Sequence, residues 1–170
     1  MSSPEIDRRA RSFADAATAL LELVESLDAA QWQAPSVEDG RPIGTIAHHI
    51  ALGHAIGHWR VIAAASGYPQ PLQQGTAVER NAAHAAGTLA PDRDTTLRLL
   101  RTGAAAVEAA IRSLRDDQLD TEITIGPMAG TIARLVDGAR NHVLEHDATI
   151  RRSISACEPG PWRKGGRTNG

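Results

Sequence analysis

The sequence is poor in aromatic residues, cysteine and lysine. Aromatic residues make up 3% of its 170 residues, Cys157 is the single cysteine, and Lys164 is the single lysine. One thiol cannot form an internal disulfide, which is typical of a protein from a reducing cytoplasm. The net charge of −2 leaves no excess of basic residues, so a nucleic-acid partner is not expected.

Long apolar runs are also missing. No stretch approaches 18 consecutive apolar residues, and the charged N-terminal segment lacks the apolar core of a signal peptide. The sequence therefore predicts neither a membrane partner nor a targeting segment, and we expect a cytoplasmic protein. Much of its 42% hydrophobic content is alanine, which favours helix.

The N-terminal segment carries the clearest helical pattern. Ser3 followed by Pro4 is a typical helix start, with a capping side chain and proline in the first turn. Apolar residues then recur in alternating steps of four and three, which is the seam of a left-handed helical bundle. They are Ile6, Ala10, Phe13, Ala17, Leu20, Val24 and Leu27.

Three further helices are predicted over residues 42–66, 92–114 and 131–156. Together the four segments predict an all-α fold, a four-helix bundle formed as one domain by residues 1–158, with a flexible tail over 159–170. The connection over 67–90 is longer than an antiparallel hairpin needs, so we expect a crossover that leaves the second and third helices parallel. The segment 121–130 alternates like a short strand or an extended linker.

Two histidines continue the apolar seam of the last predicted helix. After Ile132, Leu135 and Ala139, the next positions in the same rhythm are His142 and His146. Imidazoles four residues apart lie on one helical face, where both can reach a single cation. The alternative is that each is a core histidine, but each ring would then need its own buried partner.

A third ligand is expected from the second helix, which is rich in histidine. His48 points away from the apolar stripe and is expected to be solvated, whereas periodicity does not choose between His49 and His54. His54 and His58 are spaced four apart and could form a separate site. His84 lies in the long connection, where we expect it to be exposed.

Two segments resemble the DinB/YfiT-like superfamily of metalloenzymes. They are PIGTIAHHIALGH at 42–54 and GPMAGTIARLVDGARNHVLEHDATI at 126–150. The superfamily includes mycothiol-dependent maleylpyruvate isomerases and bacillithiol transferases. The resemblance implies a bundle with a crossover between helices two and three, metal ligands at His49, His142 and His146, and in many members a homodimer.

A cation held by three neutral imidazoles would keep an open position for water or a thiol. Zinc, nickel or iron would suit these ligands. Glu145 could accept a proton there or orient a ligand, or it could be a solvated surface acid. We expect a metal-dependent enzyme acting on a small molecule, as a transferase or isomerase using a low-molecular-weight thiol. The alternatives are a metal-dependent hydrolase and a non-catalytic metal- or ligand-binding bundle.

Overall fold

The computed structural model describes residues 3–68, 77–88, 90–125 and 128–157. The long helices are α1 (Pro4–Ser26), α3 (Ile43–Ala65), α5 (Arg93–Arg112) and α7 (Ile132–Cys157). The shorter elements are α2 (Ala29–Gln33), α4 (Ala77–Gly87), α6 (Asp116–Leu119), β1 (Glu122–Ile125) and β2 (Met128–Thr131). The predicted tail over 159–170 lies outside the described residues.

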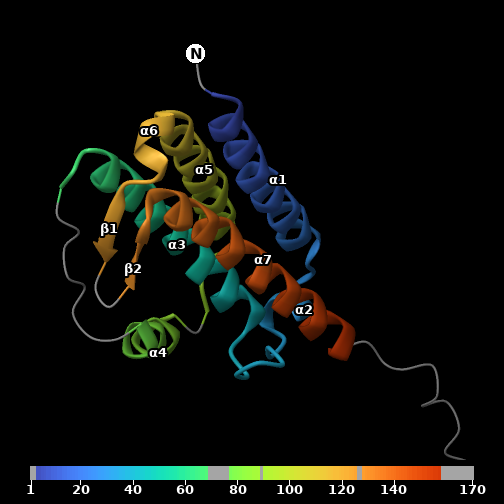
Figure 1. The fold of residues 1–170 in the computed structure, drawn as a ribbon. Helices are drawn as coiled ribbons and strands as arrows, with labels where there is room; N and C mark the ends of the chain where they lie inside the picture. The colour runs from blue at the N-terminus through green and yellow to red at the C-terminus, as the bar shows by residue number, and fades with distance from the viewer. Residues whose placement is uncertain (1–2, 69–76, 89, 126–127, 158–170) are drawn as a thin grey trace, which may run out of the picture.

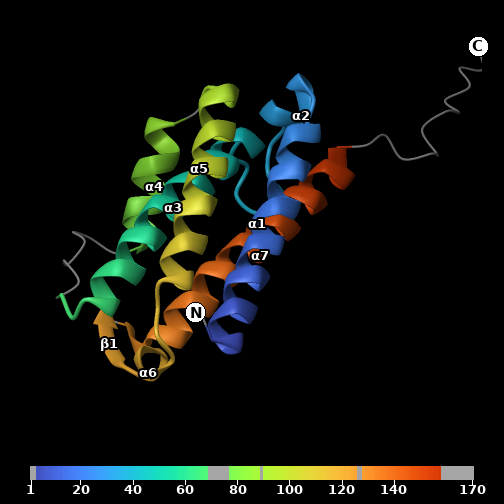
Figure 2. The same cartoon turned by 90° about the horizontal axis from the view of Figure 1, so that it is seen from above.

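The four long helices form a four-helix bundle, as the sequence predicts (Figures 1 and 2). Within it, α5 packs against both α1 and α3, and α7 packs against the same two helices from the other side. The apolar side chains of all four helices meet in one core. None of the helices in the described part of the chain is long and apolar enough to cross a membrane.

The first helix forms for the reasons that its sequence suggests. The Ser3 hydroxyl accepts a hydrogen bond from the backbone N–H of Ile6 at 3.2 Å, which caps the free end of α1. All seven residues of the predicted stripe are at most 5% exposed, so the alternating spacing is confirmed as the buried seam. The cap and the stripe together fix where α1 begins and which face it buries.

The helices α3 and α5 run parallel, which confirms the predicted crossover. Gly103 lies against His54 near the middle of α3, and Val107 lies against Gly57 one turn further along. Beyond the end of α5, the Gln118 side-chain amide donates to the Ala65 carbonyl at 2.8 Å. The contacts therefore advance along both helices in the same direction, while α4 occupies part of the connection between them (Figure 1).

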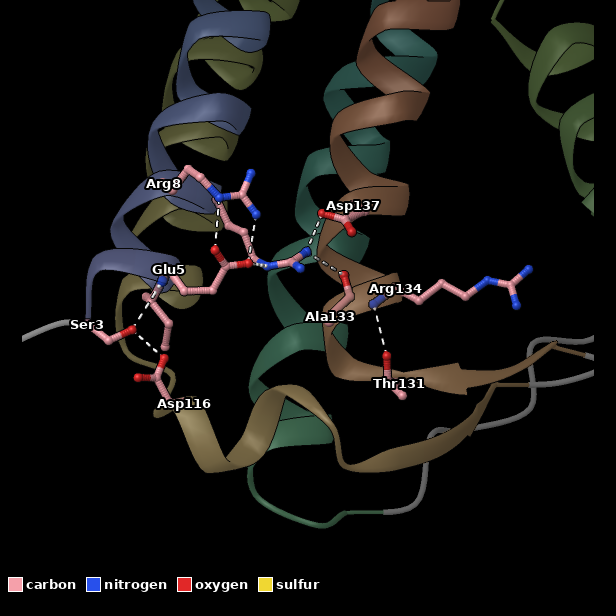
Figure 3. A network of polar contacts seen from close by, with 10 residues as sticks. Ser3, Glu5, Arg8, Asp116, Thr131, Ala133, Arg134 and Asp137 are labelled. Carbon is pink, nitrogen blue, oxygen red and sulfur yellow. Dashed lines mark hydrogen bonds and ion pairs between the residues drawn. The ribbon is translucent and has the colours of Figure 1, made fainter.

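A polar network at the same end of the bundle joins the starts of α1, α6 and α7 (Figure 3). Arg9 on α1 binds the carboxylates of Glu5 and Asp137 and donates to the Ala133 carbonyl at the start of α7. Ser3 also contacts Asp116 of α6. Because Arg9 joins the starts of α1 and α7, these two helices run parallel.

The segment predicted as a strand or extended linker forms a hairpin. Strands β1 and β2 pair antiparallel, with Glu122 opposite Thr131 and Ile123 opposite Gly130. The hairpin leads directly into α7, and the Thr131 hydroxyl accepts from the Arg134 backbone N–H at 3.3 Å. The hairpin thereby fixes the start of the helix that carries His142 and His146.

The start of α3 is fixed by close packing on α2. Trp32 is 5% exposed, and its indole ring covers Gly44 so closely that an added Cβ would lie 2.3 Å from Trp32 Cε2. Only glycine permits this approach without a shift of the ring. The contact sets the position from which α3 runs toward its histidines.

Substituting Gly44→Ala should therefore lower the free energy of unfolding by about 2 kcal/mol or more, because a buried ring must move. Gly138→Ala is the matched control, since it lies inside α7 with nothing within 4 Å of the added Cβ. That variant should gain up to about 1 kcal/mol from better helix propensity. Urea unfolding measures the free energy of unfolding of both variants. Equal changes at the two positions would contradict the packing argument.

Candidate metal centre

Three histidines from two helices converge in the bundle. His49 of α3 and His142 and His146 of α7 each place one ring nitrogen so that all three lie within 4.8 Å of one another. The two nearest, Nε2 of His49 and Nε2 of His142, are 3.3 Å apart. Nitrogens bound to one tetrahedral zinc ion are separated by about 3.4 Å, so the three rings need only small side-chain movements to share a cation.

The packing of α3 on α7 produces this arrangement. His142 and His146 are one turn apart on α7, with ring centroids 4.7 Å apart. Gly53 on α3 faces His142, and a Cβ added there would lie 3.0 Å from Cε1 of that ring. The absence of a side chain at this position lets the two helices approach closely enough for His49 to meet both rings.

Burial keeps the three imidazoles neutral. Burial, together with the charges that His142 and His146 would carry, lowers the pKa of His49 to about 3. Burial likewise lowers the pKa of His146 to about 4, and it lowers the pKa of His142, where the Glu145 carboxylate opposes the effect. Near neutral pH all three rings therefore offer lone pairs, the form that a metal requires.

His54, the other candidate from the second helix, lies elsewhere. It is 3% exposed and packs edge-on against Phe13 of α1, with ring centroids 5.7 Å apart. Neither ring nitrogen has a hydrogen-bond partner. Burial lowers the pKa of His54 and the nearby Leu100 backbone offsets part of this effect, which leaves the pKa at about 4. Within the described part of the chain, neither His54 nor His58 belongs to a group of three or more side chains that could share a metal ion.

The predictions for His48 and His84 were wrong. Both are half-buried, and their rings stack with Nδ1 of His48 at 2.9 Å from Nε2 of His84. His84 also lies against His49, with ring centroids 5.6 Å apart. The reason is that the long connection folds into α4, which lies against the outer side of α3 and covers a face that periodicity assigns to solvent.

A cavity of about 520 Å³ opens beside His146. Glu145 lines it from α7, as does Glu38 from the loop before α3. The Thr149 hydroxyl lies 3.2 Å from the Glu38 carboxylate. Sequence reasoning singles out Glu145 but misses Glu38, because no periodic pattern relates a loop residue to a helix more than one hundred positions away.

A family model described as the DinB superfamily matches residues 12–150. The chain belongs to the DinB superfamily. This agrees with the resemblance of the two histidine-containing segments, both of which lie within the matched region. No curated protein matches the chain in sequence.

Solved structures share the fold at low sequence identity. YfiT from Bacillus subtilis, described as a probable metal-dependent hydrolase with an unusual four-helix bundle topology, superposes with a TM-score of 0.75 at 19% identity, covering 92% of this chain and 89% of YfiT. The mycothiol-dependent maleylpyruvate isomerase superposes at 0.73 with 14% identity, and a histidine-to-alanine mutant of it at 0.72. The match covers 85% of this chain and 60% of the isomerase, so this DinB protein corresponds to part of that enzyme.

The buried His54 should make stability depend on pH. Its pKa in the folded protein, about 4, lies below the value of 6.5 expected after unfolding, so the unfolded chain binds a proton first as the pH falls. The stability present above pH 6.5 is then lost toward pH 4. Between pH 7 and pH 5, protonation of His54 in the unfolded chain should lower the free energy of unfolding by about 2 kcal/mol.

Urea unfolding of chelator-treated protein tests this prediction. His54→Leu should flatten the pH dependence by about that amount, without loss of stability at pH 7, because its ring nitrogens have no partners to lose. Ile62→Leu, an exposed position on the same helix with no titratable group, should keep the wild-type slope. Identical slopes for His54→Leu and the wild type would show that His54 is not held neutral by burial.

Proposed function

We propose that this DinB protein is a metal-dependent enzyme, in which His49, His142 and His146 hold a divalent transition metal while a small molecule reacts beside it. The convergence of these three ring nitrogens carries the proposal.

The residues fit a metal better than they fit a structural role. Three neutral rings place their nitrogens together, yet only one pair, His49 and His142, is within hydrogen-bond distance. A single hydrogen bond leaves the other ring nitrogens with lone pairs free to bind a cation. Nitrogen ligands of this kind suit zinc, nickel or ferrous iron, and such an ion would supply Lewis acidity and an open position for water or a thiol.

Glu145 is the proposed proton acceptor. It follows His142 by three positions on α7 and lines the cavity that opens beside His146. Its carboxylate is close enough to oppose the lowering of the His142 pKa. A proton released from water or a thiol in this cavity would therefore meet a carboxylate held on a rigid helix, the geometry that general-base catalysis needs.

We favour a thiol-dependent transferase or isomerase as the reaction class. Its support is the shared fold of the mycothiol-dependent isomerase. A metal-dependent hydrolase is the second candidate, and it is favoured by the match to YfiT, which covers most of both chains. Both reactions need the same three histidines and the same proton acceptor. A low-molecular-weight thiol as cofactor, a cytoplasmic location and a homodimer stay predictions.

The three histidines should bind metal as one unit. Wild-type protein should retain about one transition metal ion per chain and gain thermal stability when zinc is added. His49→Ala, His142→Ala and His146→Ala should each lower metal affinity at least about tenfold. His58→Ala is the matched control on α3 and should bind as the wild type does. Metal analysis measures the ion content of each protein, and thermal unfolding with added zinc measures its stabilisation. Retention of metal by all three variants would refute the site.

Glu145→Gln should separate catalysis from metal binding. Loss of the proton acceptor should lower kcat about 100-fold while the metal content stays unchanged. The assay is turnover of a panel of esters and of electrophiles supplied with low-molecular-weight thiols. Glu22→Gln, at an exposed position of α1, is the control and should keep full activity. Unchanged turnover in Glu145→Gln would remove this residue from the mechanism.

A further inference from the structure

The loop before α3 places Glu38 on the wall of the cavity beside His146. The backbone N–H of Glu38 donates to the Ser36 hydroxyl at 3.1 Å, and the N–H of Val37 donates to the Ser153 hydroxyl, also at 3.1 Å. Ser36 is 5% exposed, and Ser153 on α7 is fully buried. The loop is therefore fastened to the helix that supplies the rest of the cavity lining, so Glu38 belongs to this wall.

A buried hydroxyl on α7 holds Glu38 close to a side chain of opposite charge. Thr149 is 3% exposed, and its Oγ1 lies 3.2 Å from Oε2 of Glu38. The same oxygen accepts a hydrogen bond from Nη2 of Arg152 at 3.0 Å. Arg152 lines the same cavity, so a carboxylate and a guanidinium lie on this wall with one hydroxyl between them.

The two charges are close but not paired. Among the described residues, neither Glu38 nor Arg152 forms an ion pair with the other or with a further charged side chain. The Thr149 hydroxyl has one proton to donate, and the Glu145 carbonyl competes for it at 3.1 Å. The Glu38 carboxylate therefore keeps most of its acceptor positions for a ligand, and the Arg152 guanidinium keeps most of its donors.

The rest of the lining suits a short aliphatic group. Leu144 and Ala148 add apolar surface to the cavity, and Leu144 is 38% exposed. The cavity volume of about 520 Å³ is in the range of small-molecule sites. A ligand that uses the whole lining would carry an ammonium group and a carboxylate close together, on a short aliphatic chain.

We propose that Glu38 and Arg152 determine substrate specificity by binding the ammonium and the carboxylate of an amino acid or a similar small molecule. Both contacts are charge-assisted hydrogen bonds, and Thr149 keeps the two protein charges from pairing directly with each other. Because His146 lines the same cavity, such a ligand would lie beside the candidate metal centre. Its role as the substrate of that centre rests on the proposed function, whereas the two contacts themselves need no metal.

An NMR titration of chelator-treated protein with L-norvaline tests the two contacts. Removing the metal excludes direct chelation of zinc by the amino acid. Norvalinamide lacks the carboxylate, and N-acetylnorvaline lacks the ammonium group. Wild-type protein should bind norvaline at least about tenfold more tightly than either analogue, because each analogue loses a charge-assisted hydrogen bond.

Two variants assign each contact to one residue. Glu38→Gln should weaken norvaline binding about tenfold and should bind norvaline and N-acetylnorvaline with similar affinity, since the partner of the ammonium is gone. Arg152→Gln should weaken norvaline binding to the same extent and should bind norvaline and norvalinamide with similar affinity. Each variant should keep its selectivity for the group that the other residue binds.

Arg151→Gln and Glu22→Gln are the matched controls. Arg151 is the neighbour of Arg152 on α7, but it pairs with Asp147 and does not line the cavity. Glu22 is partly exposed on α1. Both controls should bind norvaline as the wild type does. Thermal unfolding checks that all four variants fold, which we expect because Glu38 and Arg152 are exposed.

The outcomes separate this inference from the proposed function. Failure of wild-type protein to hold zinc at the three histidines contradicts the proposed function, while the metal-free titration still decides the two contacts. Loss of one selectivity in each variant, as described, supports the inference. Absent or equal binding of the three compounds by wild-type protein, or wild-type selectivity in either Glu38→Gln or Arg152→Gln, overturns it.

Discussion

The close antiparallel packing of α3 on α7 is the contact on which the candidate centre depends. It sets His49 against His142 and His146, and Gly53 permits it by presenting no side chain to the His142 ring. Other contacts of the bundle position the two helices that make this contact. Trp32 fixes the start of α3, and the β1–β2 hairpin with the Arg9 network fixes the start of α7. Two rigid helices are thereby held in one register.

The same packing decides the chemistry that the site can support. Burial in the bundle lowers the pKa of His49 to about 3, of His146 to about 4, and also lowers the pKa of His142, so the rings are ready to act as ligands rather than as cations. The side chains around the three histidines, in contrast, are charged. Glu38 and Glu145 line the cavity beside His146, and the charge of Arg41 adds to the lowering of the pKa of His49 and of His146. A neutral ligand set surrounded by fixed charges of both signs is typical of a site that orients a polar small molecule.

Much of the fold follows from the sequence because helical periodicity is a local property. The cap at Ser3, the seven-residue stripe of α1 and the crossover inferred from connection length are all confirmed. Periodicity also shows that His142 and His146 share a face. It cannot choose between His49 and His54, because a helical angle gives a direction and not the identity of the neighbouring helix. His54 faces Phe13 on α1, whereas His49 faces α7. The positions of His84 and Arg41 depend on how a connection folds over the bundle, and no repeating pattern in the chain encodes that.

The central claim is that one cation is shared by imidazoles from α3 and α7. A crystal structure of the purified protein, with diffraction data collected at the absorption edge of the metal found in the sample, tests it most directly. We expect one anomalous peak about 2.0–2.2 Å from a nitrogen of each of His49, His142 and His146, with at least one further position open to solvent or ligand. A fully loaded crystal in which the peak lies elsewhere, or in which the three rings turn away from one another, would contradict the account.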